Sequence, residues 1–331
     1  MTAPDPTAHS ETPGQQTAPG PQAARGAQDS PGGRVGGVVH AALAARLVLP
    51  AIGLALAGTI LGIAAPDTIA WMILVPAAIV FIVWKKPWRQ SLGLRGFAFA
   101  GIFGILFVGY LRCMFVAMNH LPVGTVVVFL MSPNLCVFAI YGLGKRRFFG
   151  LALAFVGLAA FAGQAFLSVG IGDVRDGVVA SLSAGIFSLG ATVAHNVAAH
   201  FGYDRSAFSG VGLATAAILF GLHGAPVVDM PALTGHFIAI SIVVSLLMVI
   251  IPGLLSRNVA QRAGRRTEGR YNVFYPAAAM LAGGIVLGQV PSLLDLLGLA
   301  LITGALWIMS GVTIVPRRFF RKRGSGEMTA D

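Results

Sequence analysis

The sequence has little charge and almost no cysteine. Only 11% of its 331 residues are charged, 56% are hydrophobic, and there are 12 acidic residues against 23 lysines and arginines. Water-soluble proteins carry charge on about a quarter of their residues, so the composition argues against a water-soluble enzyme. The two cysteines, Cys113 and Cys136, both lie inside apolar stretches. Neither a disulfide framework nor a cysteine-based metal site is therefore expected.

The hydrophobic residues are collected into about ten apolar stretches, and the mean hydropathy is +0.80. Each stretch has roughly 18–25 residues, which is enough to cross a hydrocarbon layer of about 30 Å. The sequence therefore predicts an all-α integral membrane protein with ten transmembrane helices. The expected spans are 39–63, 68–84, 97–118, 123–142, 148–166, 177–199, 206–223, 235–256, 271–290 and 293–315.

Basic residues concentrate in every second turn between these stretches. The turns after the second, fourth, sixth, eighth and tenth stretches are basic, whereas the remaining turns carry aspartates with Arg175 as their only cation. This alternation follows the positive-inside rule and predicts that both termini are cytoplasmic. The formal charge of +11 then reflects topology and contact with lipid headgroups, so the lipid bilayer is an expected partner and nucleic acid is not.

The two ends of the chain differ from the rest. Residues 1–37 are rich in proline, glycine, glutamine and threonine and contain no apolar run, which predicts a disordered cytoplasmic tail. They also lack the hydrophobic core of a signal peptide. Residues 317–331 are predicted to form a basic cytoplasmic tail.

An internal repeat is visible in the apolar stretches. The sequence Gly-Leu-Ala-Leu occurs at 150–153 and again at 298–301, and Pro133 and Pro276 interrupt the stretches that precede the two copies. Residues 38–170 and 171–316 are thus predicted to be two copies of one five-helix unit. Because five is odd, the second copy enters the membrane from the opposite side. Inverted repeats of this kind are typical of secondary transporters with a central site.

Particular motifs resemble a known family. Met-Asn-His-Leu-Pro-Val-Gly at 118–124, Met-Ser-Pro-Asn at 131–134 and the second-repeat Tyr275-Pro276 resemble the helix junctions of EamA-type carriers of the drug/metabolite transporter superfamily. Lys-Pro-Trp-Arg at 86–89 and Ile-Pro at 251–252 resemble the threonine/homoserine exporter branch of that superfamily.

The resemblance covers about residues 65–315. It implies ten helices with both termini inside, and a permease for amino-acid export in the cytoplasmic membrane. The chain departs from the family pattern in several places: Tyr275, Lys145 and Gln289 stand where the family usually has Glu, and the second stretch lacks the usual Arg. No Asp or Glu lies deep in any stretch, so the coupling ion is left open.

Arg112 is the strongest candidate for substrate binding. A charged side chain within a transmembrane stretch costs about 2.5–3.5 kcal/mol near the bilayer centre, so it needs a function or a partner. We expect Arg112 to face a central cavity and to pair with a substrate carboxylate. The alternative is that its side chain extends to the outer interface or binds helix-end carbonyls.

The other candidates are polar residues and prolines within the stretches. His195 and Asn196 lie one turn from the end of the sixth stretch, where a histidine can carry a proton or form an interhelical hydrogen bond. Prolines free backbone carbonyls that can line a cavity, so polar residues near them are candidate ligands. The candidate hinges are Pro133, Pro252 and Pro276, and the further candidate substrate ligands are Ser132, Asn134, Tyr275 and Tyr110.

These patterns predict a secondary transporter that exports amino acids or similar small polar metabolites by alternating access. A carrier of drugs, or of sugar-linked or lipid-linked metabolites, on the same fold is the alternative. A membrane enzyme and ATP-driven transport are not favoured, since the sequence has neither a metal-ligand or acidic motif nor a phosphate-binding loop. No catalytic residue, metal or cofactor is expected. The small-residue pairs Gly58/Gly62 and Gly284/Gly288 permit close helix approach and leave a homodimer open.

Overall fold

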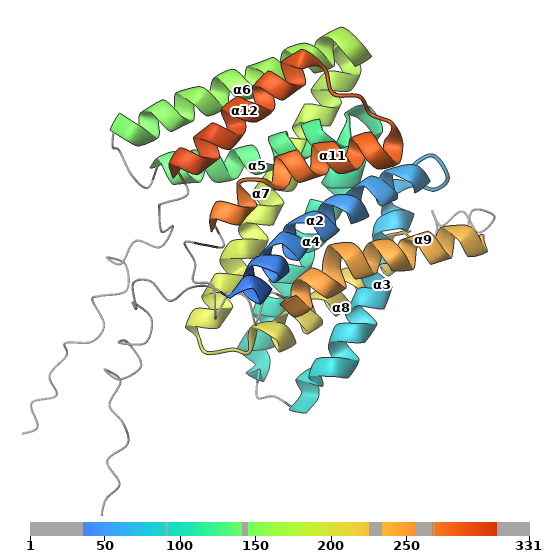
Figure 1. Ribbon diagram of the computed structural model, residues 1–331. Coiled ribbons are helices and arrows are strands. Elements are labelled where there is room, and N and C mark those ends of the chain that lie inside the picture. Colours follow the sequence, from blue (N-terminus) through green and yellow to red (C-terminus); the bar gives the residue numbers. More distant parts are fainter. Residues whose placement is uncertain are drawn as a thin grey trace, which may run out of the picture. The chain divides into compact units, whose positions relative to one another are not determined.

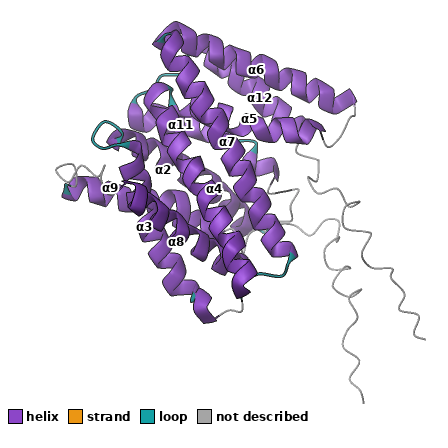
Figure 2. Cartoon of the chain, turned by 180° about the vertical axis from the view of Figure 1, so that it is seen from behind, coloured by secondary structure: helices purple, strands orange, loops and turns teal. Residues whose placement is uncertain are grey.

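The computed structural model describes residues 36–89, 92–140, 145–224, 234–255, 267 and 269–309. Helix is the only regular secondary structure in these ranges (Figure 2). The helices belong to one unit, Gly37–Asp331. The tails predicted over 1–37 and 317–331 lie outside the described residues, except for Gly36 and Gly37.

Ten α-helices occupy the described ranges, one in each predicted stretch. Four short features accompany them: the 3-10 turn η1 after α3, the π-helical segment η3 that continues α9, a helical segment at 269–272, and the turn at 273–274 that joins this segment to α11. The bounds are α2 Gly37–Ile60, α3 Pro66–Lys85, η1 Pro87–Arg89, α4 Gly93–His120, α5 Val123–Ile140, α6 Lys145–Val169, α7 Ile171–His200, α8 Arg205–Gly224, α9 Gly235–Ser245, η3 Leu246–Ile250, α11 Tyr275–Leu287 and α12 Leu293–Met309.

Six of these helices are long and apolar enough to cross a membrane. They are α2, α3, α4, α6, α7 and the continuous segment Gly235–Leu255 formed by α9 and η3. The chain is therefore a multi-pass membrane protein. The apolar parts of α5, α8, α11 and α12 are shorter, between 10 and 17 residues, so the prediction of ten spans goes further than helix length alone supports.

The helices pack in a regular set of pairs. Helix α4 packs against α7 and α8, and α3 packs against α8 and α9. Helix α2 packs against α9 and α11, while α5 packs against α7 and α11. Helices α6 and α12 pack mainly against each other, and both views show them side by side (Figures 1 and 2).

Contacts between helix ends define two ends of this unit. At one end, His120 contacts Asp173, and the backbone N–H of Val123 donates to Gln289. We call this the acidic end. At the opposite end, which we call the basic end, His40 contacts the Tyr271 hydroxyl at 2.7 Å. Consecutive helices run in alternating directions between the two ends.

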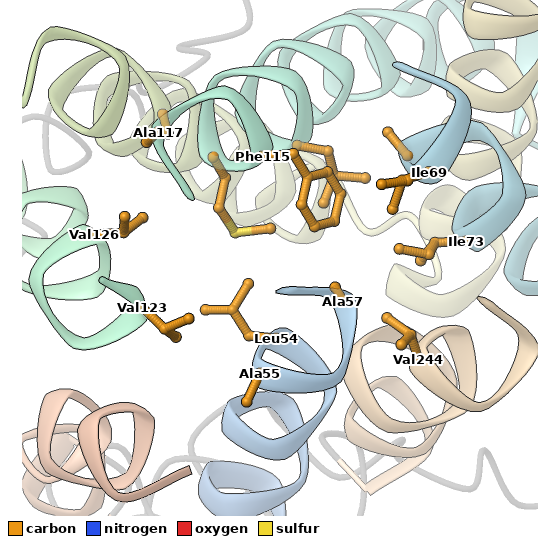
Figure 3. Packing of buried hydrophobic residues seen from close by; sticks show 14 of the residues in the cluster. Leu54, Ala55, Ala57, Ile69, Ile73, Phe115, Ala117, Val123, Val126 and Val244 are labelled. Atoms are coloured by element: carbon orange, nitrogen blue, oxygen red, sulfur yellow. The ribbon is translucent and has the colours of Figure 1, made fainter. Parts of the chain in front are cut away.

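An apolar core fills the space between the helices. Figure 3 shows Leu54 of α2, Ile73 of α3 and Phe115 of α4 pointing toward one another, and all three are fully buried. In a bilayer, such packing is stabilised by van der Waals contact and by close backbone approach at small residues. Gly185 of α7 is one such residue, because a Cβ there would lie 2.8 Å from Cγ of Pro133.

The three expected hinge prolines lie in different settings. Helix α5 continues through Pro133. Pro252 follows η3, in which the N–H of Ile251 bonds to the carbonyl of Leu246. The ninth stretch is interrupted by the turn at 273–274, which follows helical residues 269–272, and Pro276 is buried in the first turn of α11 directly after it. Proline fits there because the first turn of a helix needs no N–H donor. Its role as a hinge stays a prediction.

Candidate functional site

Two tyrosines from the two halves of the chain pack against the same apolar core. Tyr110 lies on α4 and Tyr275 is the first residue of α11. Both side chains are partly buried against this core. Among the described residues, neither hydroxyl has a hydrogen-bond partner. The pair can therefore offer two donor and acceptor groups to a small polar ligand.

Local backbone geometry explains the position of Tyr275. Phe274, which precedes it, has φ −87° and ψ 0°, and its side chain does not cap the helix. Helix α11 starts afresh at Tyr275, so this stretch is a discontinuous helix. Discontinuous transmembrane helices are typical of transporter binding sites, because the irregular backbone is tolerated where it lines a polar cavity.

The ring of Tyr110 is in contact with the aromatic ring of Phe107. Its ring lies 5.6 Å from that of Phe107, tilted by 47°. Cys113 follows one turn later on the same face of α4 and is a partly buried free thiol. The site is thus a small group of aromatic and weakly polar side chains.

Arg112 forms an ion pair that the sequence did not reveal. Its Nε lies 3.2 Å from Oδ1 of Asp67, which is in the first turn of α3. The Arg112 side chain is 50% exposed, whereas that of Asp67 is only 18% exposed. Intramembrane charges commonly pair in this way, and an aspartate in the first turn also interacts favourably with the helix dipole.

The orientation of Arg112 differs from the expectation of a cavity-facing side chain. Residues two apart on a helix point about 200° away from each other, so Arg112 and Tyr110 lie on opposite faces of α4. Arg112 shares its face with exposed apolar residues, among them Leu94 and Ile105. The structure therefore does not bring Arg112 together with the tyrosine pair. A role in substrate binding stays a prediction.

Ser132 and Asn134 both lie on α5, beside Pro133. Ser132 is buried, and its hydroxyl donates a 2.7 Å hydrogen bond to the carbonyl of Phe129. This carbonyl is the one that Pro133 leaves without its usual N–H donor. The hydroxyl proton of Ser132 thus has an internal partner, while Asn134 is partly buried.

His195 and Asn196 lie near the basic end of α7. The His195 ring lies between Phe103 and Phe208, at centroid distances of 6.1 and 6.0 Å, and its Nδ1 is 3.4 Å from the Ser209 hydroxyl. Asn196 is exposed. This environment fits the interhelical contact that the sequence offered as the alternative, and the proton-carrying role is untested.

Several polar contacts were missed at the sequence level. In the sequence, Asp67 is only one of the aspartates in the non-basic turns, and no pattern joins it to Arg112. Gln289 is notable because it departs from the family pattern: its amide oxygen accepts from the N–H of Val123 at 3.1 Å, which links the first turn of α5 to the loop after α11. Such pairings join residues far apart in the sequence, so only the tertiary structure shows them.

No protein-family model and no curated protein matches the chain. Among solved structures, one named only "Crystal structure of protein" matches with a TM-score of 0.55 and 20% identity, over 82% of this chain and 96% of its own. At this level of identity, the similarity concerns the fold alone.

Proposed function

We propose that the chain is a secondary transporter that moves a small polar metabolite, an amino acid above all, across the cytoplasmic membrane by alternating access. The site would lie between two inverted five-helix repeats, α2–α6 and α7–α12. No catalytic step is part of this proposal.

One observation carries the proposal: the main helix pairs are preserved when each helix is exchanged for its counterpart in the other half. The α4–α7 pair corresponds to α9–α2, the α4–α8 pair to α9–α3, and the α5–α7 pair to α11–α2. The α3–α8, α5–α11 and α6–α12 pairs each join a helix to its own counterpart. This pattern supports a two-fold relation between halves that run in opposite directions, the arrangement found in many transporters.

The helix-end contacts support ten crossings rather than six. The short helix α5 starts, and the short helix α11 finishes, at the acidic end where the long helix α4 finishes and α7 starts, since Val123 meets Gln289 and His120 meets Asp173 there. The acidic end carries Asp173, and in the sequence the basic turns alternate with the turns that carry aspartates. By the positive-inside rule, the basic end would be cytoplasmic, with both termini on that side.

The tyrosine pair is the best candidate for substrate contact. Tyr110 comes from the first repeat and Tyr275 from the second, so a ligand held by both would respond to movement of one repeat against the other. At the acidic end the halves are closed against each other, since a Cβ on Gly58 would lie 2.8 Å from the Leu287 side chain.

The amino-acid assignment is supported by the resemblance to the threonine/homoserine exporter branch. The alternative, a carrier of drugs or sugar-linked metabolites, is favoured by the ring contact between Phe107 and Tyr110, because aromatic side chains bind apolar and sugar rings. The two proposals differ only in the solute.

A counterflow assay in proteoliposomes tests the proposal. Liposomes that contain the purified protein would be loaded with an unlabelled solute. The labelled form of the same solute would then be added outside, with threonine, homoserine, a hydrophobic drug and a nucleotide sugar tested in turn. We expect counterflow of an amino acid, reduced about threefold to tenfold in Tyr110→Phe and Tyr275→Phe, because each change removes one hydrogen bond to the solute.

The matched control is Tyr203→Phe, because Tyr203 packs against Gly96 at the basic end, away from the pair. Counterflow of the drug or the nucleotide sugar alone would replace the amino-acid proposal with its alternative. No counterflow of any solute by folded protein, or equal rates in all three variants, would contradict the proposed site.

A further inference from the structure

The end of α3 and the turn η1 carry a compact group of cations and tryptophans: Trp84, Lys85, Lys86, Trp88 and Arg89. We call these five residues the α3–η1 corner. Trp84 is 50% exposed and Trp88 is 62% exposed, and Lys86 and Arg89 are exposed as well. The Lys85 ammonium lies 3.7 Å from the centroid of the Trp84 ring. Aromatic and cationic side chains are thus presented together at the basic end.

Backbone hydrogen bonds hold this corner in one shape. The N–H of Lys86 donates to the carbonyl of Ile82 at 2.9 Å, and the carbonyl of Lys86 accepts from the N–H of Arg89 at 2.8 Å. Lys86 has φ 44°, the left-handed conformation that ends α3. Pro87 is buried, and η1 packs against α8. Because the turn is already ordered, an anion that binds its cations costs little further backbone freedom.

Negative charge is scarce around the corner. No Asp or Glu occurs between residues 68 and 112, and α8, which η1 contacts, has none either. Asp204, just before α8, accepts a hydrogen bond from the N–H of Ala207 at 3.0 Å. Among the described residues, neither Lys86 nor Arg89 forms an ion pair. The corner therefore keeps positive charge that an anion can neutralise.

The tryptophans favour a lipid headgroup over a dissolved anion. Tryptophan is enriched where a transmembrane helix leaves the hydrocarbon, with its ring at the level of the headgroups. Trp84 lies in the last turn of a helix long and apolar enough to span a membrane, and the exposed Val80 and Val83 precede it. Lys86 and Arg89 follow directly, so these cations reach the depth of the lipid phosphates. An anionic headgroup matches their charge.

We propose that the α3–η1 corner binds the headgroup of one anionic phospholipid in a defined position. Lys86 and Arg89 bind the phosphate, and Trp84 and Trp88 pack against the glycerol and the upper part of the acyl chains. The site does not rest on the proposed transport activity, because it shares no residue with the candidate substrate site.

Native mass spectrometry of the purified full chain tests the site, with phosphatidylglycerol and phosphatidylcholine of identical acyl chains as probes. We expect tighter binding of phosphatidylglycerol, weakened about fivefold by Arg89→Gln or Lys86→Gly, since a basic residue near the surface contributes that factor. Glycine keeps the turn intact because φ is positive at this position. The matched control is Arg270→Gln, which removes an exposed cation beside Trp307 at the same end and should leave the affinity unchanged.

A second measurement uses the unaltered chain, so that a poorly folded variant cannot obscure the result. Phosphatidylglycerol with a photoreactive headgroup should crosslink to the 84–89 segment. Equal binding of the two lipids, equal effects of Arg89→Gln and Arg270→Gln, or crosslinks confined to other segments would each overturn the proposal. Displacement of the lipid by inorganic phosphate at constant ionic strength would assign the corner to a dissolved anion and would overturn it as well.

Discussion

The guanidinium of Arg112 on α4 lies 3.2 Å from the carboxylate of Asp67 on α3, and the two charges neutralise each other at the rim of the helix unit. Arg112 lies on an exposed apolar face, where an unpaired charge would meet lipid. The pair therefore explains how a cation is tolerated in this stretch without a substrate.

Neutralising either charge alone should destabilise the protein more than neutralising both. We expect Arg112→Gln to lower the free energy of unfolding by about 2 kcal/mol, because it leaves the mostly buried Asp67 without its cation. The double variant with Asp67→Asn should recover most of this loss. Thermal unfolding in detergent measures each variant.

The same variants separate a structural role of Arg112 from substrate binding. A stable double variant that still exchanges solute would show that the ion pair is structural. A stable double variant that has lost exchange would support the carboxylate-binding role predicted from the sequence. Additive losses of stability would contradict the pairing itself.

Ser132→Ala should destabilise α5, because it leaves the backbone carbonyl of Phe129 without a hydrogen-bond donor. Without the hydroxyl, the Phe129 carbonyl loses the donor that stands in for the missing N–H of Pro133, at a cost of about 1–3 kcal/mol. Ser183→Ala is the control, because the hydroxyl of Ser183 bonds to a carbonyl within the uninterrupted helix α7. Equal unfolding temperatures for the two variants would contradict this role.

Gly185→Ala should separate α5 from α7. The new Cβ would contact the Leu130 carbonyl and lie 2.8 Å from Cγ of Pro133, and such overpacking costs about 1–3 kcal/mol. Gly101→Ala, at a position on α4 where a Cβ meets open space, should instead be neutral or slightly stabilising. Unfolding in a denaturant series compares the two, and similar midpoints would show that the α5–α7 contact is looser than described.

The proposed topology predicts which ends react with a membrane-impermeant thiol reagent. In a chain with Cys113 and Cys136 replaced by serine, Gly172→Cys at the acidic end should be labelled in intact cells. Phe201→Cys, exposed at the basic end, should be labelled only after permeabilisation. Labelling of both sites from outside would exclude the ten-span arrangement.

Much of the fold follows from the sequence because it depends on local composition. Apolar stretches of membrane-spanning length form helices wherever the lipid leaves backbone groups no other partner, and all ten stretches contain a described helix. The sequence also shows which apolar stretches contain a proline. However, whether Pro276 kinks a helix or begins one depends on the backbone at Phe274, and local composition does not distinguish these outcomes.

The candidate site was only partly predictable. Tyr110 and Tyr275 were identified as polar residues within apolar stretches, but the sequence ranked Arg112 above them. A charge in a transmembrane stretch stands out in composition, whereas its direction depends on which face of α4 meets α3.

The sequence by itself determined that this chain enters a membrane many times, because the cost of exposing apolar side chains to water depends on composition alone. The tertiary structure decided which polar groups meet: Arg112 with Asp67, and Gln289 with the first turn of α5. These contacts depend on how distant helices pack against one another, and helix packing is set by shape complementarity along whole faces rather than by any short segment.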